Sequence, residues 1–438
     1  MGGARAAALS ALQKWNRADA WSDAALNAAI IRGGLDARDA ALASRICYGT
    51  IQNLLLIDHW LSRCSNRPLN KLEPVVLDIL RLSAYQLLLM DRVPAHAVVD
   101  EAVTLCKEKG KGRASGFVNA VLRKAASMNR EIPDLPAEGT AEYLSIRFSH
   151  PLWLCENWID AHGYAFAEAA VAANNEQPPV CLQCNQLRVD ASRLLAELRE
   201  AGYDVQPHAQ LPDAVLCSGG DLAASAPFSN GWFYVQDAAA KCAVLLADPQ
   251  PGMRVLDACA APGGKTFSAA VQMCDQGEIV SCDIHENKLK RLRDGAARMG
   301  FQSIQTMAMD AREPTLPAES FDVVMADVPC SGLGVIRKKP EIRYKDPKAL
   351  MALPKIQLDI LCGQANMVRP GGVLLYSTCT VERAENEDVV QAFLELHPDF
   401  RLEALSLPWL NEPSGMHTFW PHIDGTDGFF VAKMRKLS

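Results

Sequence analysis

Two cysteines that directly follow apolar segments are the residues whose surroundings most strongly suggest chemistry. Cys330 lies in ADVPCSG, just past a segment that ends at Asp327, and Cys379 lies in YSTCT, just past another. A lone cysteine is usually a small buried hydrophobic residue. Two thiols and a carboxylate at the ends of neighbouring strands would instead meet at one edge of a sheet, and we expect these side chains to lie close together.

A chemistry that needs two thiols and a carboxylate is substitution at carbon 5 of a pyrimidine. This carbon is a poor nucleophile, but addition of a thiolate to carbon 6 turns it into an enamine carbon that can attack a methyl sulfonium. A carboxylic acid can hydrogen-bond N3 and stabilise the adduct, and a base must then remove the carbon 5 proton so that the thiol can leave. One thiol therefore adds to the ring, and the other group assists release.

A loop earlier in the chain indicates an adenosine-type cofactor. In VLDACAAPGGKT an apolar strand reaches Asp257, and Gly263 and Gly264 precede a helix whose N-terminus offers free N–H groups. Asp283 ends the next strand, where a carboxylate accepts hydrogen bonds from ribose hydroxyls, and Asp310 closes a third strand and fits a partner for adenine. The spacing does not match a P-loop. The alternative is an ordinary strand-to-helix turn with a capping aspartate.

The segments that carry these residues alternate between strand and helix patterns. Strands are expected at 254–259, 278–283, 303–310, 321–327 and 372–378, with helices between most of them. This alternation predicts a doubly wound, Rossmann-like α/β domain that binds ligands beyond the carboxyl ends of its strands. We place this domain at residues 236–438.

Two other regions precede the α/β domain. Residues 1–147 carry helical apolar stripes, for example in a helix expected from Pro74 to Met90, and predict an all-α domain. Residues 148–235 predict a small α+β linker module. Its expected strands lie at 180–184, 214–217 and 232–235, with a helix at 191–201.

Composition limits the class of protein. The 438 residues favour two to three domains, and 14 irregularly spaced cysteines are typical of thiols in a reducing compartment. No uninterrupted apolar stretch of about 18 residues occurs, so we expect a soluble cytoplasmic protein without a membrane partner. We also expect a monomer. The net charge of −7 gives no global support for nucleic-acid binding. Cys181-x-x-Cys184 lacks a second cysteine or histidine pair, so we expect no metal.

The region from about 230 to 438 resembles the RNA 5-methylcytosine methyltransferases, whose cofactor is S-adenosylmethionine. The resemblance rests on CAAPGGKT, DVPCSGLGVIRKKPEIRY and STCTVERAENEDVV, with Val328 and Thr380 where Ala and Ser are more usual. It implies that Cys379 is the nucleophile, that Cys330 helps to eliminate the product, and that Asp327 is catalytic. The residues it implies for the cofactor are Cys259, Ala260, Ala261, Pro262, Gly263, Gly264, Lys265, Asp283, Asp310 and Asp327.

The N-terminal region resembles NusB-like RNA-binding domains, on the segments VPAHAVVDEAV and GFVNAVLRK. This architecture implies an enzyme of rRNA processing that acts on 16S rRNA, at the loop cytosine C967. A 5-methylcytosine methyltransferase acting on tRNA is one alternative. A non-catalytic RNA-binding assembly factor is the other, although such a protein has no need of two thiols at one edge of a sheet.

Two basic runs are candidates for contact with RNA phosphates. The first run contains Lys107, Lys109, Lys111 and Arg113. The second run follows Cys330 and contains Arg337, Lys338, Lys339, Arg343, Lys345 and Lys348. Because the RNA strand must pass close to Cys330, we expect the second run to contact it.

Overall fold

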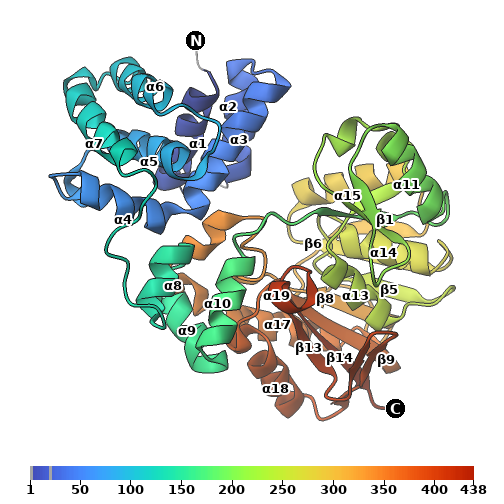
Figure 1. The fold of residues 1–438 in the computed structure, drawn as a ribbon. Coiled ribbons are helices and arrows are strands. Elements are labelled where there is room, and N and C mark those ends of the chain that lie inside the picture. The colour runs from blue at the N-terminus through green and yellow to red at the C-terminus, as the bar shows by residue number, and fades with distance from the viewer. Residues whose placement is uncertain (1–2, 19–21) are drawn as a thin grey trace. The chain divides into compact units, whose positions relative to one another are not determined.

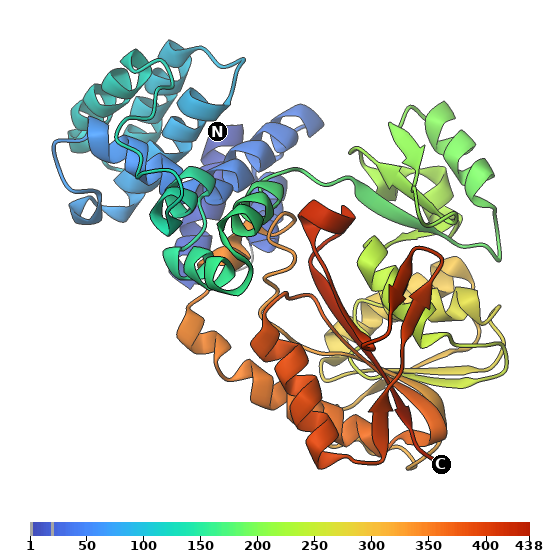
Figure 2. The same cartoon turned by 60° about the horizontal axis from the view of Figure 1, so that its bottom comes forward.

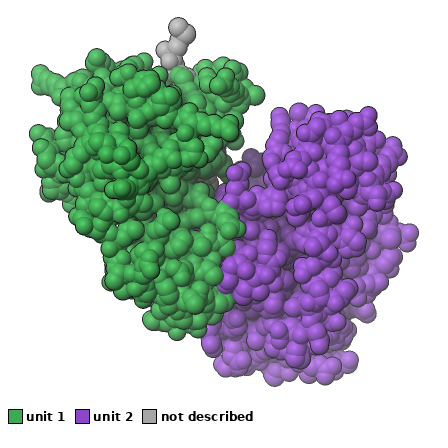
Figure 3. Space-filling model, viewed as in Figure 1, with its two compact units in different colours: residues 1–176, 339–344 green, residues 177–338, 345–438 purple. Residues whose placement is uncertain are grey.

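The computed structural model describes residues 3–18 and 22–438, which form two compact units. Unit 1 contains Met1–Glu176 and Lys339–Tyr344, and unit 2 contains Gln177–Lys338 and Lys345–Ser438 (Figure 3). Among the described residues, no single helix is long and apolar enough to cross a membrane. Two helices joined at a bend, Ala37–Gln52 and Leu54–Cys64, reach the required length and composition when they are taken together.

Unit 1 is built from helices, which confirms the predicted all-α N-terminal domain (Figure 1). They are α1 (Ala4–Ala18), α2 (Ser22–Gly33), α3 (Ala37–Gln52), α4 (Leu54–Cys64), α5 (Pro74–Leu89), α6 (Ala95–Glu108), α7 (Ser115–Ser127), α8 (Ala141–Phe148), α9 (Leu152–His162) and α10 (Tyr164–Ala173). Helix α5 contacts α1, α3, α4, α6 and α7, and most of its residues are buried, Ile79 and Leu80 completely. Its Pro74 occupies the first turn, where a missing N–H costs no hydrogen bond.

The short helix η4 (Pro340–Tyr344) also belongs to unit 1, although unit 2 surrounds it in the sequence. Arg343 is completely buried, and its Nη1 donates to the backbone oxygens of Gln52 and Ser149 and to Oδ1 of Asn175, at 3.0–3.1 Å. Burial lowers the pKa of the guanidinium to about 10. The prediction that Arg343 contacts RNA is therefore wrong, because this side chain lies in the interior of unit 1.

Unit 2 begins with a small antiparallel sheet in the order β2-β3-β1-β4. Its strands are β1 (Val180–Cys184), β2 (Val205–Pro207), β3 (Ala214–Cys217) and β4 (Phe233–Val235), with helices α11 (Ala191–Glu200) and α12 (Ala226–Ser229). This confirms the predicted small α+β module, to which the structure adds the short strand β2.

A larger sheet follows in the order β10-β14-β9-β8-β5-β6-β7, with β13 paired to β14. Its strands are β5 (Arg254–Asp257), β6 (Glu278–Asp283), β7 (Ile304–Ala308), β8 (Phe321–Asp327), β9 (Val368–Thr378), β10 (Phe400–Leu402), β13 (Met416–Phe419) and β14 (Phe429–Lys436). Strands β5 to β9 are parallel, and β14 is antiparallel to β9. The order reverses between β5 and β8, so this switch point is the expected place for a ligand.

Helices cover both faces of the larger sheet, as Figure 2 shows. Val323 and Met325 of β8 pack in one core with α13 (Ala238–Ala247), α14 (Gly264–Gln272) and α15 (Glu286–Met299). Val324 and Ala326 point to the other face and pack with α17 (Leu353–Ala365) and α18 (Glu387–Leu396). Because successive residues of β8 are buried on opposite faces, the prediction of a doubly wound domain is confirmed.

Candidate active site

The loop after β5 adopts a conformation that requires glycine. Gly263 has a φ of +117°, and a Cβ at this position would lie 2.6 Å from a ring carbon of Phe267. Helix α14 begins directly after it, so the loop ends at a helix N-terminus. The amide of Ala260 donates to the carbonyl oxygen of Cys282 at 2.7 Å, which holds the loop against the end of β6.

The end of β6 fits an adenosine. Asp283 is the last residue of β6, and its Oδ1 accepts the amide of His285 at 2.8 Å, so its carboxylate is held at the edge of the sheet. The neighbouring Ile284 exposes 57% of its surface, which offers an apolar face to a planar ring. Ile284 was not among the predicted site residues, because nothing in the sequence distinguishes it from a buried residue at the end of a strand. Asp310 follows β7, and its carboxylate pairs with Arg312 at 2.6 Å, which lowers its pKa.

The two thiols meet at the carboxyl ends of β8 and β9. These strands are parallel neighbours in which Asp327 pairs with Ser377, and the sulfurs of Cys330 and Cys379 lie 3.2 Å apart. The predicted closeness of the two thiols is therefore confirmed. A hydrogen bond to Cys379, burial, and the nearby carboxylates of Glu385 and Asp327 raise the pKa of Cys330 well above its ordinary value. Of the two thiols, Cys330 is therefore the one whose surroundings favour the protonated form.

Asp327 connects the thiols to the cofactor loop. Its Oδ2 pairs with the ammonium group of Lys265 at 2.7 Å, and its Oδ1 accepts the hydroxyl of Ser377 at 2.9 Å. Lys265 also lies 4.9 Å from the centre of the Phe429 ring. The resemblance assigned Lys265 to the cofactor only, whereas the structure places it directly on the carboxylate beside the thiols.

Asn386 holds the loop of Cys379. Its Oδ1 accepts the hydroxyl of Thr378 at 2.6 Å, and its Nδ2 donates to the carbonyl oxygen of Thr380 at 3.1 Å. The side chain of Asn386 is fully buried and bridges the residues on both sides of Cys379. These two hydrogen bonds therefore restrain the conformation of this loop.

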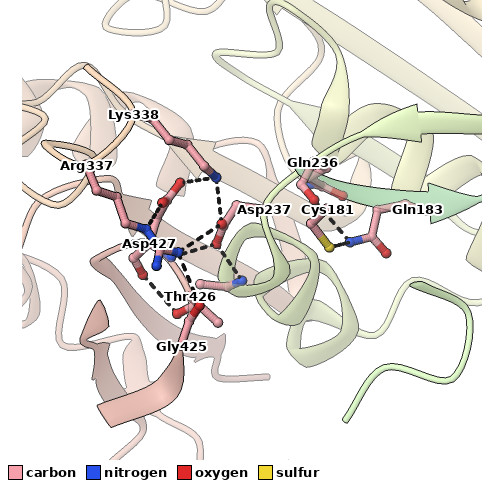
Figure 4. A network of polar contacts seen from close by, with 10 residues as sticks. Cys181, Gln183, Gln236, Asp237, Arg337, Lys338, Gly425, Thr426 and Asp427 are labelled. Carbon is pink, nitrogen blue, oxygen red and sulfur yellow. Dashed lines mark hydrogen bonds and ion pairs between the residues drawn. The ribbon is translucent and has the colours of Figure 1, made fainter. Parts of the chain in front are cut away.

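The second basic run does not provide a row of available charges. Arg337 pairs with Asp427 at 2.9 Å, and Lys338 pairs with Asp237 and Asp427 at 2.8 and 2.7 Å (Figure 4). Lys345 donates to the carbonyl oxygen of Ser331 at 2.7 Å. These three side chains are each bound to acidic or backbone groups, and their predicted contact with RNA stays a prediction. Lys348 remains exposed.

No group of three or more possible metal ligands from His, Cys, Asp and Glu occurs among the described residues. Cys181 and Cys184 are buried, and burial raises the pKa of each thiol to about 12. Both behave as core residues rather than as a ligand pair. That the protein uses no metal stays a prediction.

Comparison with known proteins identifies the family. The model described as 16S rRNA methyltransferase RsmB/F matches residues 243–435, the NusB family matches residues 3–127, and an RsmF/B-like ferredoxin-like domain matches residues 150–220. The probable ribosomal RNA small subunit methyltransferase B of Bacillus subtilis is 38% identical over 442 residues and covers 98% of both chains. The chain belongs to the ribosomal RNA small subunit methyltransferase B family.

Two further relatives agree with this membership. Ribosomal RNA small subunit methyltransferase B of Serratia proteamaculans is 32% identical over 407 residues, 91% of each chain. The solved structure of PH0851 has a TM-score of 0.83 at 28% identity and covers 98% of each chain. The predicted class is therefore confirmed: the chain is a 16S rRNA methyltransferase that depends on S-adenosylmethionine.

Proposed function

We propose that this enzyme methylates carbon 5 of a loop cytosine in 16S rRNA, C967, through a covalent adduct between Cys379 and carbon 6. The observation that carries the proposal is the 3.2 Å separation of the Cys330 and Cys379 sulfurs beside Asp327. Cys330 and Cys379 are both free cysteines, and both lie at the carboxyl edge of a doubly wound sheet. S-adenosylmethionine, held by Cys259–Lys265, Asp283 and Asp310, supplies the methyl group when bound.

The residues act in a defined order. The thiolate of Cys379 adds to carbon 6, so an S–C6 bond forms and the electron pair of the C5=C6 bond moves into the ring. Asp327, which is paired with Lys265, lies beside the thiols and hydrogen-bonds N3, which stabilises the adduct. After carbon 5 has been methylated, Cys330 releases its own proton to solvent, and the resulting thiolate takes the proton from carbon 5. The electron pair re-forms the double bond, and the S–C6 bond breaks to return the thiolate of Cys379.

The two thiols suit these successive roles. The hydrogen bond to Cys379 is the largest cause of the raised pKa of Cys330. Once the sulfur of Cys379 is bonded to carbon 6, it is no longer a thiolate that can accept the proton of Cys330. This cause of the raised pKa of Cys330 therefore disappears. Cys330 then loses its proton more readily at the stage when its thiolate is required.

The remaining parts of the proposal concern recognition. Carbon 6 cannot be reached inside a stacked helix, so the target base must be unpaired or flipped out. Lys107, Lys109 and Arg113 of unit 1 are exposed and can contact phosphates, whereas Lys111 pairs with Glu73.

We propose domains at 1–147, 148–235 and 236–438, and a protein that acts as a monomer.

The test is to incubate the full chain with methyl-labelled S-adenosylmethionine and, separately, protein-free 16S rRNA, small ribosomal subunits and bulk tRNA, and then to map the labelled base. Label at carbon 5 of C967 is expected. Label in tRNA alone would keep the mechanism and overturn the substrate. Absence of label in every RNA would overturn the proposed activity.

A further inference from the structure

Two buried side chains form hydrogen bonds with the backbone on both sides of Cys330. Oε2 of Glu385 accepts the amide N–H of Ser331 at 2.8 Å, and Nε2 of Gln357 donates to the carbonyl oxygen of Pro329 at 3.0 Å. The same Nε2 of Gln357 donates to Oε2 of Glu385 at 2.8 Å. The chain from Pro329 to Ser331 is therefore closed into a ring of hydrogen bonds, with Cys330 at its centre.

We infer that Glu385 and Gln357 are positioning residues that hold Cys330 for the release of the methylated base. We call them the clamp. Neither residue touches the reacting atoms. The inference rests on the proposed function. It gives a role in catalysis to α17, which carries Gln357 and contributes none of the predicted site residues.

The cost of burial argues against a purely stabilising role. Gln357 is completely buried, and Glu385 exposes only 4% of its surface. Burial of a carboxylate costs free energy even when it is hydrogen-bonded, and well-packed apolar residues often stabilise a fold equally well. An apolar side chain in place of Glu385 would leave the amide of Ser331 without this partner and would free the backbone beside Cys330.

Ser331 shows how firmly this loop is held. Besides donating its amide to Glu385, it donates its hydroxyl to Oγ1 of Thr380 at 2.7 Å, and its carbonyl oxygen accepts the ammonium group of Lys345 at 2.7 Å. The bond to Thr380 joins the residues that directly follow the two cysteines. The separation of the two sulfurs is therefore set by these contacts together with the clamp.

The clamp and the Cys379 loop depend on different side chains. Asn386 binds Thr378 and Thr380, whereas Glu385, its neighbour in the sequence, binds the Cys330 loop. Loss of the clamp should therefore displace Cys330 and leave Cys379 in place. Addition and methylation would continue, while removal of the carbon 5 proton would slow down. The protein would then accumulate as a covalent RNA adduct, which a general loss of stability would not produce.

The experiment compares Glu385→Ala, Glu385→Gln and Gln357→Met in the full chain with 16S rRNA and S-adenosylmethionine. The readouts are the fraction of protein that migrates as an RNA adduct on a denaturing gel, kcat, KM for RNA, and the melting temperature. Glu385→Ala and Gln357→Met should accumulate adduct and lose about 10- to 100-fold in kcat, with KM changed by less than about twofold. Glu385→Gln keeps an oxygen that accepts both hydrogen bonds, so it should recover turnover relative to Glu385→Ala.

A matched control lies on the same helix. Gln364 of α17 is also completely buried and donates to the carbonyl oxygen of Ala311 at 2.6 Å, away from Cys330. Gln364→Met should lower the melting temperature about as much as Gln357→Met, but it should not accumulate adduct. Adduct with both variants would mean that trapping reports lost stability, and the inference would be overturned.

The reference variants separate failure of the clamp from failure of the proposed function. If Cys330→Ala traps adduct while folded Gln357→Met turns over like the wild type, or loses activity without adduct, the clamp is overturned and the proposed function stands. If Cys379→Ala still methylates RNA, the proposed function fails and the clamp fails with it. If Glu385→Ala does not fold, Gln357→Met decides the result. Methionine has nearly the volume of glutamine, so this substitution should preserve the packing of the interior.

Discussion

The loops that carry Cys379 and Cys330 differ in the origin of their hydrogen-bond partners. Asn386 holds the Cys379 loop from six and eight residues away in the sequence. Ser331, in the Cys330 loop, is bound by Lys345 and Glu385, which lie 14 and 54 residues away. The side chain that bridges the Cys379 loop thus comes from its own segment, although Ser331 and the amide of Gly334 also bind this loop, at Thr380 and at the carbonyl oxygen of Cys379. The side chains that bind the Cys330 loop come from distant parts of the chain. Distant substitutions should therefore affect release more readily than addition.

The largest expected effect comes from the two thiols themselves. Cys379→Ala should lower methyl transfer by at least about 10³-fold and form no adduct, because the nucleophile is lost. Cys330→Ala should instead accumulate a covalent RNA adduct, because addition proceeds and elimination does not. Methyl incorporation and a denaturing gel measure both results. If Cys379→Ala trapped the adduct instead, the assigned roles would be reversed.

A smaller effect is expected when the Cys379 loop is loosened. Asn386→Ala removes the bridge between Thr378 and Thr380 and should slow adduct formation by about 10- to 100-fold, because a small misplacement of the nucleophile is costly. Single-turnover methylation measures this rate, and no adduct should accumulate.

The control for this variant is Gln391→Ala, an exposed position on the same helix α18. Its rate should equal that of the wild type. Accumulation of adduct in Asn386→Ala would show that the two loops are not held independently, and the comparison between them would then fail.

The smallest effect is expected at the contact that joins the two loops. Thr380→Ser keeps the hydroxyl that binds Ser331, so turnover should change by less than about twofold. Thr380→Val removes that hydroxyl while preserving the shape, and the loss of one hydrogen bond worth about 1 kcal/mol corresponds to roughly a fivefold decrease in kcat. Steady-state kinetics of both variants decide the point, and equal rates would show that the bridge has no part in catalysis.

The arrangement of the thiols could be predicted from the sequence for a topological reason. In a doubly wound sheet the carboxyl ends of parallel strands share one edge, so Cys330 and Cys379 were expected together once the strands ending at Asp327 and Thr378 were recognised. The strand boundaries at 278–283 and 321–327 agree with β6 and β8. These strands could be recognised as short, nearly continuous apolar runs, because both of their faces are buried.

The partners of charged residues could not be predicted in the same way. Arg337 and Lys338 read as an RNA-binding run because their acids, Asp427 and Asp237, lie about 90 and 100 residues away in the sequence. Gln357 gave no signal either, because a buried glutamine that binds a backbone carbonyl has no sequence pattern. Strand β14 was missed for a related reason: its antiparallel place beside β9 depends on a sheet edge that only the folded chain provides.

The burial of residues 340–343 in unit 1 restricts how this protein can be divided or recombined. The chain leaves unit 2 after Lys338, contributes six residues to unit 1, and returns at Lys345. A single cut near residue 176 would leave Arg343 without its acceptors in one fragment and an unfilled interior in the other. A chimaera with a relative must therefore exchange this hexapeptide together with residues 1–176, and one crossover between them cannot yield two self-contained modules.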